Sequence, residues 1–237
     1  MSDPGPWAES LPDAGPLTPG EVHVWSASLT RFAEEAAGLH RLLSSDEEAH
    51  AARYKDPRAG DSYRTGRGIL RTLLARYIDR APSDIEITRG PHGKPGVAPC
   101  HGVVCQFNVA HSGDAALFAF TASARVGVDL ERVRADIDLP ALCANFLTPE
   151  EQAEVRVLPP DAQAEFFFTR WVRREAFLKA SGEGFSGEPR RLDTALWTLR
   201  DLPDFAGCKV AVCVEGFCLT PCPPSLHSFL ALREGGA

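Results

Sequence analysis

The sequence predicts an α+β fold, because runs that alternate apolar and polar residues are mixed with segments of helical periodicity. Residues 21–29, EVHVWSASL, alternate as a half-buried strand does. Residues 61–78 and about 165–180 instead repeat apolar side chains every three to four positions. Between residues 103 and 133, three more strand-like runs are separated only by short turns, which predicts an antiparallel meander. We therefore expect antiparallel strands packed on helices.

Composition narrows the class of protein without naming an activity. The 237 residues are 44% hydrophobic and 24% charged, which is typical of a globular domain. No run approaches the roughly 20 apolar residues of a spanning helix, and no signal peptide is visible, so we expect a cytoplasmic protein without a membrane partner. A net charge of -7 argues against nucleic acid as a partner, and an anionic ligand must meet a local basic patch.

The cysteines indicate a reducing compartment rather than a disulfide framework. There are seven of them, an odd number without paired CxxC spacing. Cys208, Cys213, Cys218 and Cys222 gather in a segment whose pattern predicts a hairpin. We expect them to be small buried side chains, and a metal role is the open alternative.

Two helix starts are marked by capping residues, and the N-terminus by its composition. A helix is expected to begin near Ser45, after a serine cap and with acids in its first turn. Thr148 is the expected N-cap of another helix, followed by Pro149 and, three residues after the cap, by Glu151. Residues 1–20 contain no Lys or Arg and many Pro and Gly, which predicts a flexible tail.

Basic side chains recur beside the predicted core of the first half. Arg64, Arg67 and Arg71 line up along the edge of the apolar stripe of helix 61–78. They are either a solvated face with snorkelling side chains or a site for an anion. Lys94 lies in a turn rich in Gly and Pro, where it is either simply exposed or a functional residue. His111 ends a strand, where its role is either structural or functional.

The segment GVDLERV, residues 127–133, places two acids on a strand that otherwise looks buried. Because side chains alternate along a strand, Asp129 and Glu131 project on one face and Val128 and Leu130 on the other. The pairing of two carboxylates on one face requires an explanation other than core packing.

A third acid falls inside the apolar stripe of the last long helix. Glu175 lies at the angular position of the buried residues of helix 165–180, where an ionised carboxylate is costly without a cation or donors. An i,i+4 pair with Lys179 is one explanation. A hard cation explains more, since Mg²⁺ binds carboxylates together with substrate phosphate. Whether the strand and the helix touch does not follow from the sequence.

Five motifs, in order along the chain, carry a family resemblance. HGKP and FNVAHSG precede GVDLE, FLTPEE and WVRREAFLKASGEGF. Together they resemble the signature of the 4'-phosphopantetheinyl transferases, in their longer, surfactin-synthetase-type (Sfp-type) branch, from about residue 21 to about 220. The resemblance implies a monomer of two similar α/β halves related by pseudo-twofold symmetry, residues 21–124 and 125–237. Coenzyme A would bind in the cleft between them, in one active site.

The resemblance also implies roles for particular residues. Mg²⁺, or Mn²⁺, would be held by Asp129, Glu131 and Glu175 and would bridge the pyrophosphate of coenzyme A. Lys179 would lie near the pyrophosphate, and Glu150 would assist in deprotonating the incoming serine, a role that Glu175 or a metal-bound water could take instead. The predicted coenzyme A contacts are Arg64, Arg67, Arg71, Lys94, Pro95, His111, Ser112 and Lys179.

The activity implied is transfer of the 4'-phosphopantetheine arm of coenzyme A to a serine of an apo carrier protein, with release of 3',5'-ADP. Carrier domains of fatty-acid, polyketide and nonribosomal-peptide synthases have such serines, and the branch favours secondary metabolism. Docking is expected near residues 143–151, through an exposed patch with Phe146 and Leu147, and simple core packing of Phe146 is the alternative. Two features depart from the family pattern: Arg174 replaces a lysine and Ala110 replaces a serine.

Two other functions stay open on the sequence. The first is a module that binds coenzyme A or a carrier without catalysis, an alternative based on the replacement of the family lysine by Arg174. The three acids alone are also compatible with a metal-dependent phosphohydrolase, although no motif for positioning a water accompanies them.

Overall fold

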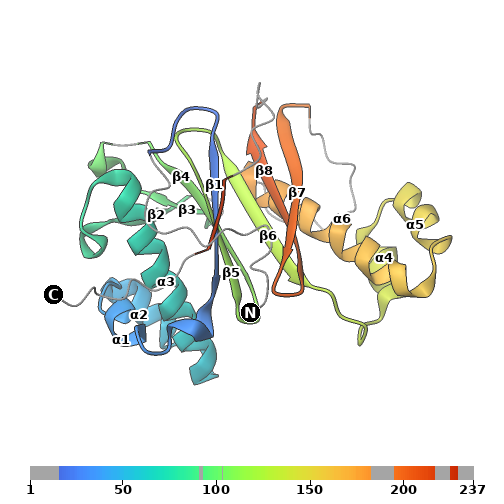
Figure 1. Ribbon diagram of the computed structural model, residues 1–237, viewed down its shortest axis with the longest axis horizontal. Coiled ribbons are helices and arrows are strands. Elements are labelled where there is room, and N and C mark those ends of the chain that lie inside the picture. The colour runs from blue at the N-terminus through green and yellow to red at the C-terminus, as the bar shows by residue number, and fades with distance from the viewer. Residues whose placement is uncertain (1–15, 91–92, 103, 183–194, 217–224, 229–237) are drawn as a thin grey trace, which may run out of the picture.

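A computed structural model of the chain describes residues 16–90, 93–102, 104–182, 195–216 and 225–228 (Figure 1). The first half contains β1 (Val22–Ser28), α1 (Ala36–His40), α2 (Ser45–Ala51), α3 (Pro57–Ile78), β2 (Ile87–Arg89), β3 (Pro95–Val97), β4 (Gln106–Ser112) and β5 (Ala115–Thr121). The second contains β6 (Val126–Arg132), α4 (Leu139–Phe146), α5 (Pro149–Arg156), α6 (Pro160–Ser181), β7 (Trp197–Phe205), β8 (Cys208–Glu215) and β9 (Ser225–Ser228).

The strands form two main sheets, in the orders β4-β5-β1-β9 and β6-β8-β7, and a short ribbon of β2 and β3. All pairs are antiparallel except β1 with β9. This arrangement confirms the α+β class. The predicted meander was wrong at its third strand, because β6 pairs with β8 of the second sheet instead of β5.

The two sheets pack face to face and each carries a long helix on its outer face, so that α3, the first sheet, the second sheet and α6 form successive layers (Figure 1). Strand β5 shows why. Its Leu117 and Ala119 belong to the core between the sheets, whereas Phe118 and Phe120 belong to the core beneath α3. All seven of its residues are therefore buried, and the strand is apolar throughout instead of alternating.

Helix α6 approaches β6 so closely that one position of the strand must be glycine. A Cβ atom added to Gly127 would lie 2.1 Å from the carbonyl oxygen of Ala176 and 2.4 Å from the nitrogen of Ala180. This contact places the α6 face of β6 directly against the helix. The prediction that β6 and α6 carry the acids of one site depends on this proximity.

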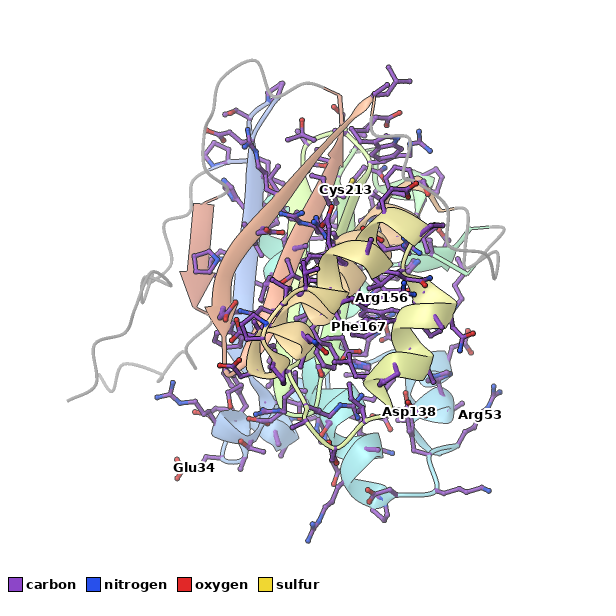
Figure 2. All side chains as sticks on the ribbon, turned by 90° about the vertical axis from the view of Figure 1, so that its right-hand side faces the viewer. Glu34, Arg53, Asp138, Arg156, Phe167 and Cys213 are labelled. Carbon is purple, nitrogen blue, oxygen red and sulfur yellow. The ribbon has the colours of Figure 1, made fainter. Side chains whose placement is uncertain are left out.

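Helices α4 and α5 form a corner against α6, in front of the second sheet in Figure 2. Its core contains Leu147, only 2% exposed, and Phe167, while Phe146 packs edge-on against Trp171. The expected exposed patch of Phe146 and Leu147 was therefore wrong for Leu147, since its side chain fills the space between the helices.

The two helix starts predicted from capping residues are confirmed, whereas α3 begins at Pro57, four residues earlier than expected. Ser44 and Thr148 both form capping boxes, with Glu47 and Glu151 respectively, immediately before α2 and α5. Helix α6 begins five residues earlier than expected, at Pro160, and ends where Gly182 adopts a φ of 76°.

The ends of the chain bear on the predicted division into halves. Of the expected N-terminal tail, residues 1–15 lie outside the described part, and Leu17 packs against the core beneath α3. Strand β9, from the second half, lies parallel to β1 in the first sheet. The boundary near residue 124 stays a prediction. Within the described ranges, no helix combines the length and apolar character that a membrane span requires.

Candidate active site

The acids of β6 face α6. Val128 and Leu130 are buried in the core between the sheets, as the alternation predicted, so Asp129 and Glu131 occupy the opposite face. Asp129 is only 6% exposed, and Lys179 of α6 donates from Nζ to its Oδ1 over 2.7 Å. The structure therefore brings the strand and the helix of the predicted site into contact.

The electrostatics of this face disfavour ionised acids. Burial raises the pKa of Asp129 to about 6, against the pull of Lys179, and Glu175 and Glu131 raise it further. The pKa of Glu175 is also raised, first by burial and then by Glu131, while Lys179 opposes the shift. A raised carboxyl pKa means that stability is lost as pH increases through it, so ionised Asp129 destabilises the fold at neutral pH. Additional positive charge at this face would offset that cost.

One atom of the site is ready to accept a ligand. The Oδ2 atom of Asp129 is buried and has no hydrogen-bond partner among the described residues. Oxygen atoms of acids are the donors that Mg²⁺ and Mn²⁺ prefer, so the chemistry of the residues fits such an ion. As the side chains are placed, no three His, Cys, Asp or Glu residues of the described ranges form a ready-made metal site. The assignment of a metal to these acids stays a prediction.

Strand β4 of the first half is joined to β6 by side chains. Asn108, buried, accepts from the backbone nitrogen of Val128 over 2.9 Å. Ser112 donates to Oε2 of Glu131 over 2.9 Å and accepts from the nitrogen of Arg132. The acidic face, formed by Asp129 and Glu131 of β6 and Glu175 of α6, therefore lies beside the seam, which is the line where β4 of the first sheet meets β6 of the second.

Lys94 crosses the same seam. Its Nζ donates to the carbonyl oxygens of Val126 and Ala180, over 2.9 and 3.1 Å, which ties the turn before β3 to the start of β6 and to the end of α6. Burial lowers the pKa of Lys94 to about 8, and the nearby Arg125 adds to the effect. A neutral amine keeps two N–H donors, so both hydrogen bonds survive deprotonation.

This environment predicts a pH-dependent contribution of Lys94 to stability. Between about pH 8 and the ordinary lysine pKa of 10.5, the unfolded chain holds a proton that the folded protein lacks, so the contribution of Lys94 increases with pH. We expect the difference in unfolding free energy between the wild type and Lys94→Met to change in favour of the wild type as the pH rises from 7.5 to 10, measured in urea titrations. Lys209→Met is the control, because Asp204 and Glu165 raise the pKa of Lys209. A gap independent of pH would contradict the assignment.

The predicted arginine row is largely engaged with acids of α2 and α3. Arg71, 2% exposed, donates to Glu47 and to the carbonyl oxygens of Pro82 and Ile85. Arg67 pairs with the other oxygen of Glu47 over 2.7 Å. The guanidinium of Arg64 donates to Glu48 and Asp61. The buried Glu47 thus holds α2 against α3, and the pKa of its carboxyl is lowered by both arginines in spite of burial.

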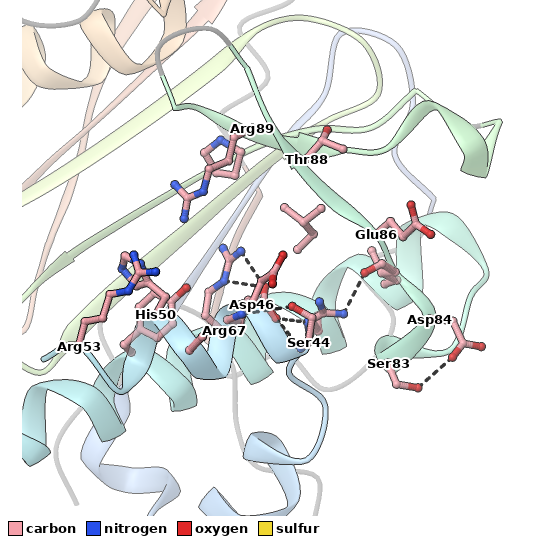
Figure 3. Close-up of a pocket in the computed structure, with 17 residues that line it drawn as sticks. Ser44, Asp46, His50, Arg53, Arg67, Ser83, Asp84, Glu86, Thr88 and Arg89 are labelled. Carbon is pink, nitrogen blue, oxygen red and sulfur yellow. Dashed lines mark hydrogen bonds and ion pairs between the residues drawn. The ribbon is translucent and has the colours of Figure 1, made fainter.

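Two neighbouring cavities open beside these residues, one of about 780 Å³ and one of about 250 Å³. Both are lined by His50, Tyr63, Arg67, Arg89 and Pro95. In Figure 3, Arg89 extends from β2 toward His50 on α2, and Arg67 of α3 lines the same cavity. His50, Tyr63 and Arg89 were not predicted as site residues from the sequence, because they come close together only when β2 folds over α2 and α3.

The cavities adjoin the acidic face through β4. His111, exposed at the end of this strand, lines the smaller cavity, and the next residue, Ser112, is bonded to Glu131. Pro95 lines the wall beside Lys94. Glu150 lies apart from this wall, exposed in the first turn of α5.

No cysteine of the described ranges lines either cavity. Those of the described ranges are free thiols, and Cys208 and Cys213 are buried in the core as expected. Cys218 and Cys222 lie outside the described residues.

Both cavities are lined by residues that precede β6, and their walls carry arginines. Cationic cavities near a cluster of acids are typical of enzymes that bind polyanionic substrates with a divalent ion. The comparisons with known proteins specify the family. Residues 24–123 match the family model "4'-phosphopantetheinyl transferase, N-terminal", and residues 125–208 match the model of the 4'-phosphopantetheinyl transferase superfamily.

Named relatives agree with these models. The chain is 34% identical over 216 residues to the 4'-phosphopantetheinyl transferase HetI of Nostoc sp., covering 85% of this chain and 90% of that protein. It is 29% identical to the transferase Sfp of Bacillus subtilis over 53% of this chain and 55% of that protein. It is 34% identical to the transferase AcpT of Escherichia coli over 47% and 55%, respectively. The chain belongs to the 4'-phosphopantetheinyl transferase superfamily, a superfamily of enzymes, as its motifs predicted.

Proposed function

We propose that this protein transfers the 4'-phosphopantetheine arm of coenzyme A to a serine hydroxyl of an apo carrier protein and releases 3',5'-ADP. The observation that carries the proposal is the position of β4. Its His111 lines a cavity with cationic walls, while the adjacent Ser112 is bonded to an acid of the second half. We infer that a nucleotide in the cavities would extend its pyrophosphate past the end of β4 toward Glu131 and Asp129.

Asp129, Glu131 and Glu175 are the residues that would hold a divalent ion. The unpartnered Oδ2 of Asp129 and the raised pKa values of Asp129 and Glu175 support this assignment. When bound, Mg²⁺ or Mn²⁺ would neutralise charge on the pyrophosphate and orient it. Ser112 positions Glu131, and Lys179 supplies the positive charge nearest to Asp129.

The serine proton needs an acceptor near the reacting phosphorus. Glu175 is the better candidate, because it is half-buried and burial, together with Glu131, raises its pKa, which makes the carboxylate a stronger base. Glu150 lies exposed on α5, where the family resemblance assigns it an assisting role. The remaining contributions are positioning and charge stabilisation, without a covalent enzyme intermediate.

We assign the nucleotide end of coenzyme A to the two cavities. His50, Tyr54 and Tyr63 form a cluster of rings with centroids 4.9 to 5.8 Å apart, which offers apolar faces to an adenine. Arg53 and Arg89 line the larger cavity, and each is exposed and has a charge available to a phosphate. This local basic patch meets the requirement set by the net charge of -7.

Replacement of Arg89 tests this assignment. Arg89→Met is expected to weaken coenzyme A binding about tenfold in calorimetry, the effect of one lost hydrogen bond to a charged group. With 3'-dephospho-coenzyme A, the wild type and the variant are expected to bind alike if Arg89 contacts the 3'-phosphate. Arg58→Met, an exposed change in the first turn of α3, is the control. Unchanged binding of coenzyme A by Arg89→Met would contradict the placement.

The carrier is assigned to the α4–α5 corner. Exposed residues there include Asn145 and Glu150, and Val157 at the end of α5 is 84% exposed. We infer that the acceptors are carrier domains of fatty-acid, polyketide or nonribosomal-peptide synthases. We also infer that the enzyme works as a cytoplasmic monomer. Free thiols throughout the described ranges support a reducing compartment.

One assay tests the function. The protein is incubated with coenzyme A, Mg²⁺ and an apo carrier, and the carrier is analysed by mass spectrometry. A phosphopantetheine adduct that requires all components and is prevented by a chelator is the expected result. Coenzyme A binding without an adduct on several types of carrier would indicate a binding module. Hydrolysis of coenzyme A without a carrier would indicate a phosphohydrolase.

A further inference from the structure

Arg174, the residue that stands where the family motif has lysine, is turned toward the α4–α5 corner. It is only 7% exposed, although it carries a charge. Its Nη1 donates to the carbonyl oxygen of Phe146, and its Nη2 lies 3.5 Å from Oε2 of Glu151. Both partners belong to the corner, and Arg174 belongs to α6.

The two partners mark the ends of the two corner helices. Phe146 is the last residue of α4, at the end of the helix where backbone carbonyls accept hydrogen bonds from groups outside the helix. Glu151 is the third residue of α5 and completes the capping box with Thr148. A single guanidinium therefore fastens the end of one helix and the start of the next to α6. The neighbouring residue, Glu175, belongs to the acidic face.

We propose that Arg174 is a positioning residue, which holds the α4–α5 corner in register with the acidic face so that a docked carrier presents its serine to the reaction. This inference rests on the proposed function for its last step. The geometry of the corner stands without it.

A planar fork suits this position better than an ammonium group. Arg174 contacts an acceptor on α4 and another on α5 through two different nitrogens of one rigid guanidinium. Lysine has a single nitrogen on a shorter side chain. Arg170, one turn earlier on α6, lies 3.7 Å from Glu151 and pairs with Glu154 over 3.0 Å. It therefore secures α5, whereas Arg174 donates a hydrogen bond from α6 to the end of α4, in addition to the apolar packing of Phe146 against Trp171.

The test compares Arg174→Lys and Arg174→Met with the wild type. Arg173→Lys is the matched control, since Arg173 sits on the same helix and pairs with Asp201 of β7. Hydrogen exchange is measured over residues 139–156, and the KM values for the apo carrier and for coenzyme A are measured separately. A purely structural role would change both KM values or neither.

We expect Arg174→Met to exchange faster over residues 139–156 and to raise the carrier KM about tenfold, the factor for one charged hydrogen bond. The KM for coenzyme A is expected to stay within about twofold, with Arg174→Lys intermediate and Arg173→Lys like the wild type. Unchanged exchange at the corner, or equal increases in both KM values, would overturn the proposal. If Arg174→Met does not fold, the same criteria apply to Arg174→Lys. Absence of transfer by the wild type would refute the proposed function instead, while exchange at the corner would still decide whether Arg174 ties it.

Discussion

Gly127→Ala is expected to lower the free energy of unfolding by about 3 kcal/mol or more, at the upper end of the range for overpacked cores. The added methyl would lie 2.1 Å from the Ala176 carbonyl oxygen and 2.4 Å from the Ala180 nitrogen. Both are backbone atoms of a helix, so neither can move aside as a side chain tip could. Relief requires α6 to shift away from β6, which separates Glu175 and Lys179 from Asp129. Urea unfolding measures the cost.

A matched glycine provides the control for this prediction. Gly38 lies in α1, and nothing stands within 4 Å of a Cβ built on it. Gly38→Ala is expected to be neutral or to stabilise the protein by about 0.5 kcal/mol, since alanine loses less conformational freedom than glycine in a helix. Equal unfolding free energies for Gly127→Ala and the wild type would show that α6 does not press on β6 as described.

Asp129→Asn and Glu175→Gln are each expected to lower kcat/KM for transfer by about 100-fold or more, the effect of removing an electrostatic contact to the transition state. Both changes keep size and remove charge from the acidic face. Because burial already disfavours ionised Asp129 and Glu175, the unfolding free energy of either variant is expected to stay within about 1 kcal/mol of the wild type.

Asp201→Asn is the control for the acids. Asp201 is an exposed acid on β7 that pairs with Arg173, so its loss is expected to leave transfer unchanged. Transfer by Asp129→Asn at the rate of the wild type would remove that residue from the proposed ligand set. The same reasoning applies to Glu175→Gln, for which a normal rate would also exclude it as the proton acceptor.

Local patterns predicted the parts of this structure that local physics determines. The capping boxes at Ser44 and Thr148 follow from short spacings of side chains and backbone. The opposite faces of Val128 and Asp129 follow from the pleat of the strand. The recognition of the family added the expectation that β6 and α6 meet, which the contact of Lys179 with Asp129 confirms.

Other features depend on distant partners and could not be read from periodicity. Arg64, Arg67 and Arg71 do lie in a row, but the sequence does not show that Glu47 reaches across from α2 to bind two of them. Strand β6 follows β5 after a short turn, as a meander would, and yet joins another sheet. The cavity residues His50 and Arg89 come from segments that carry no shared pattern.

The return of β9 to the first sheet interlocks the two parts of the chain. A break in the backbone between β5 and β6, at residues 122–125, would leave a C-terminal fragment whose own last described strand lies beside β1 of the other fragment. Such pieces would hold together without a covalent link. Fragment complementation, with each half synthesised as a separate polypeptide, is therefore a natural property of this topology.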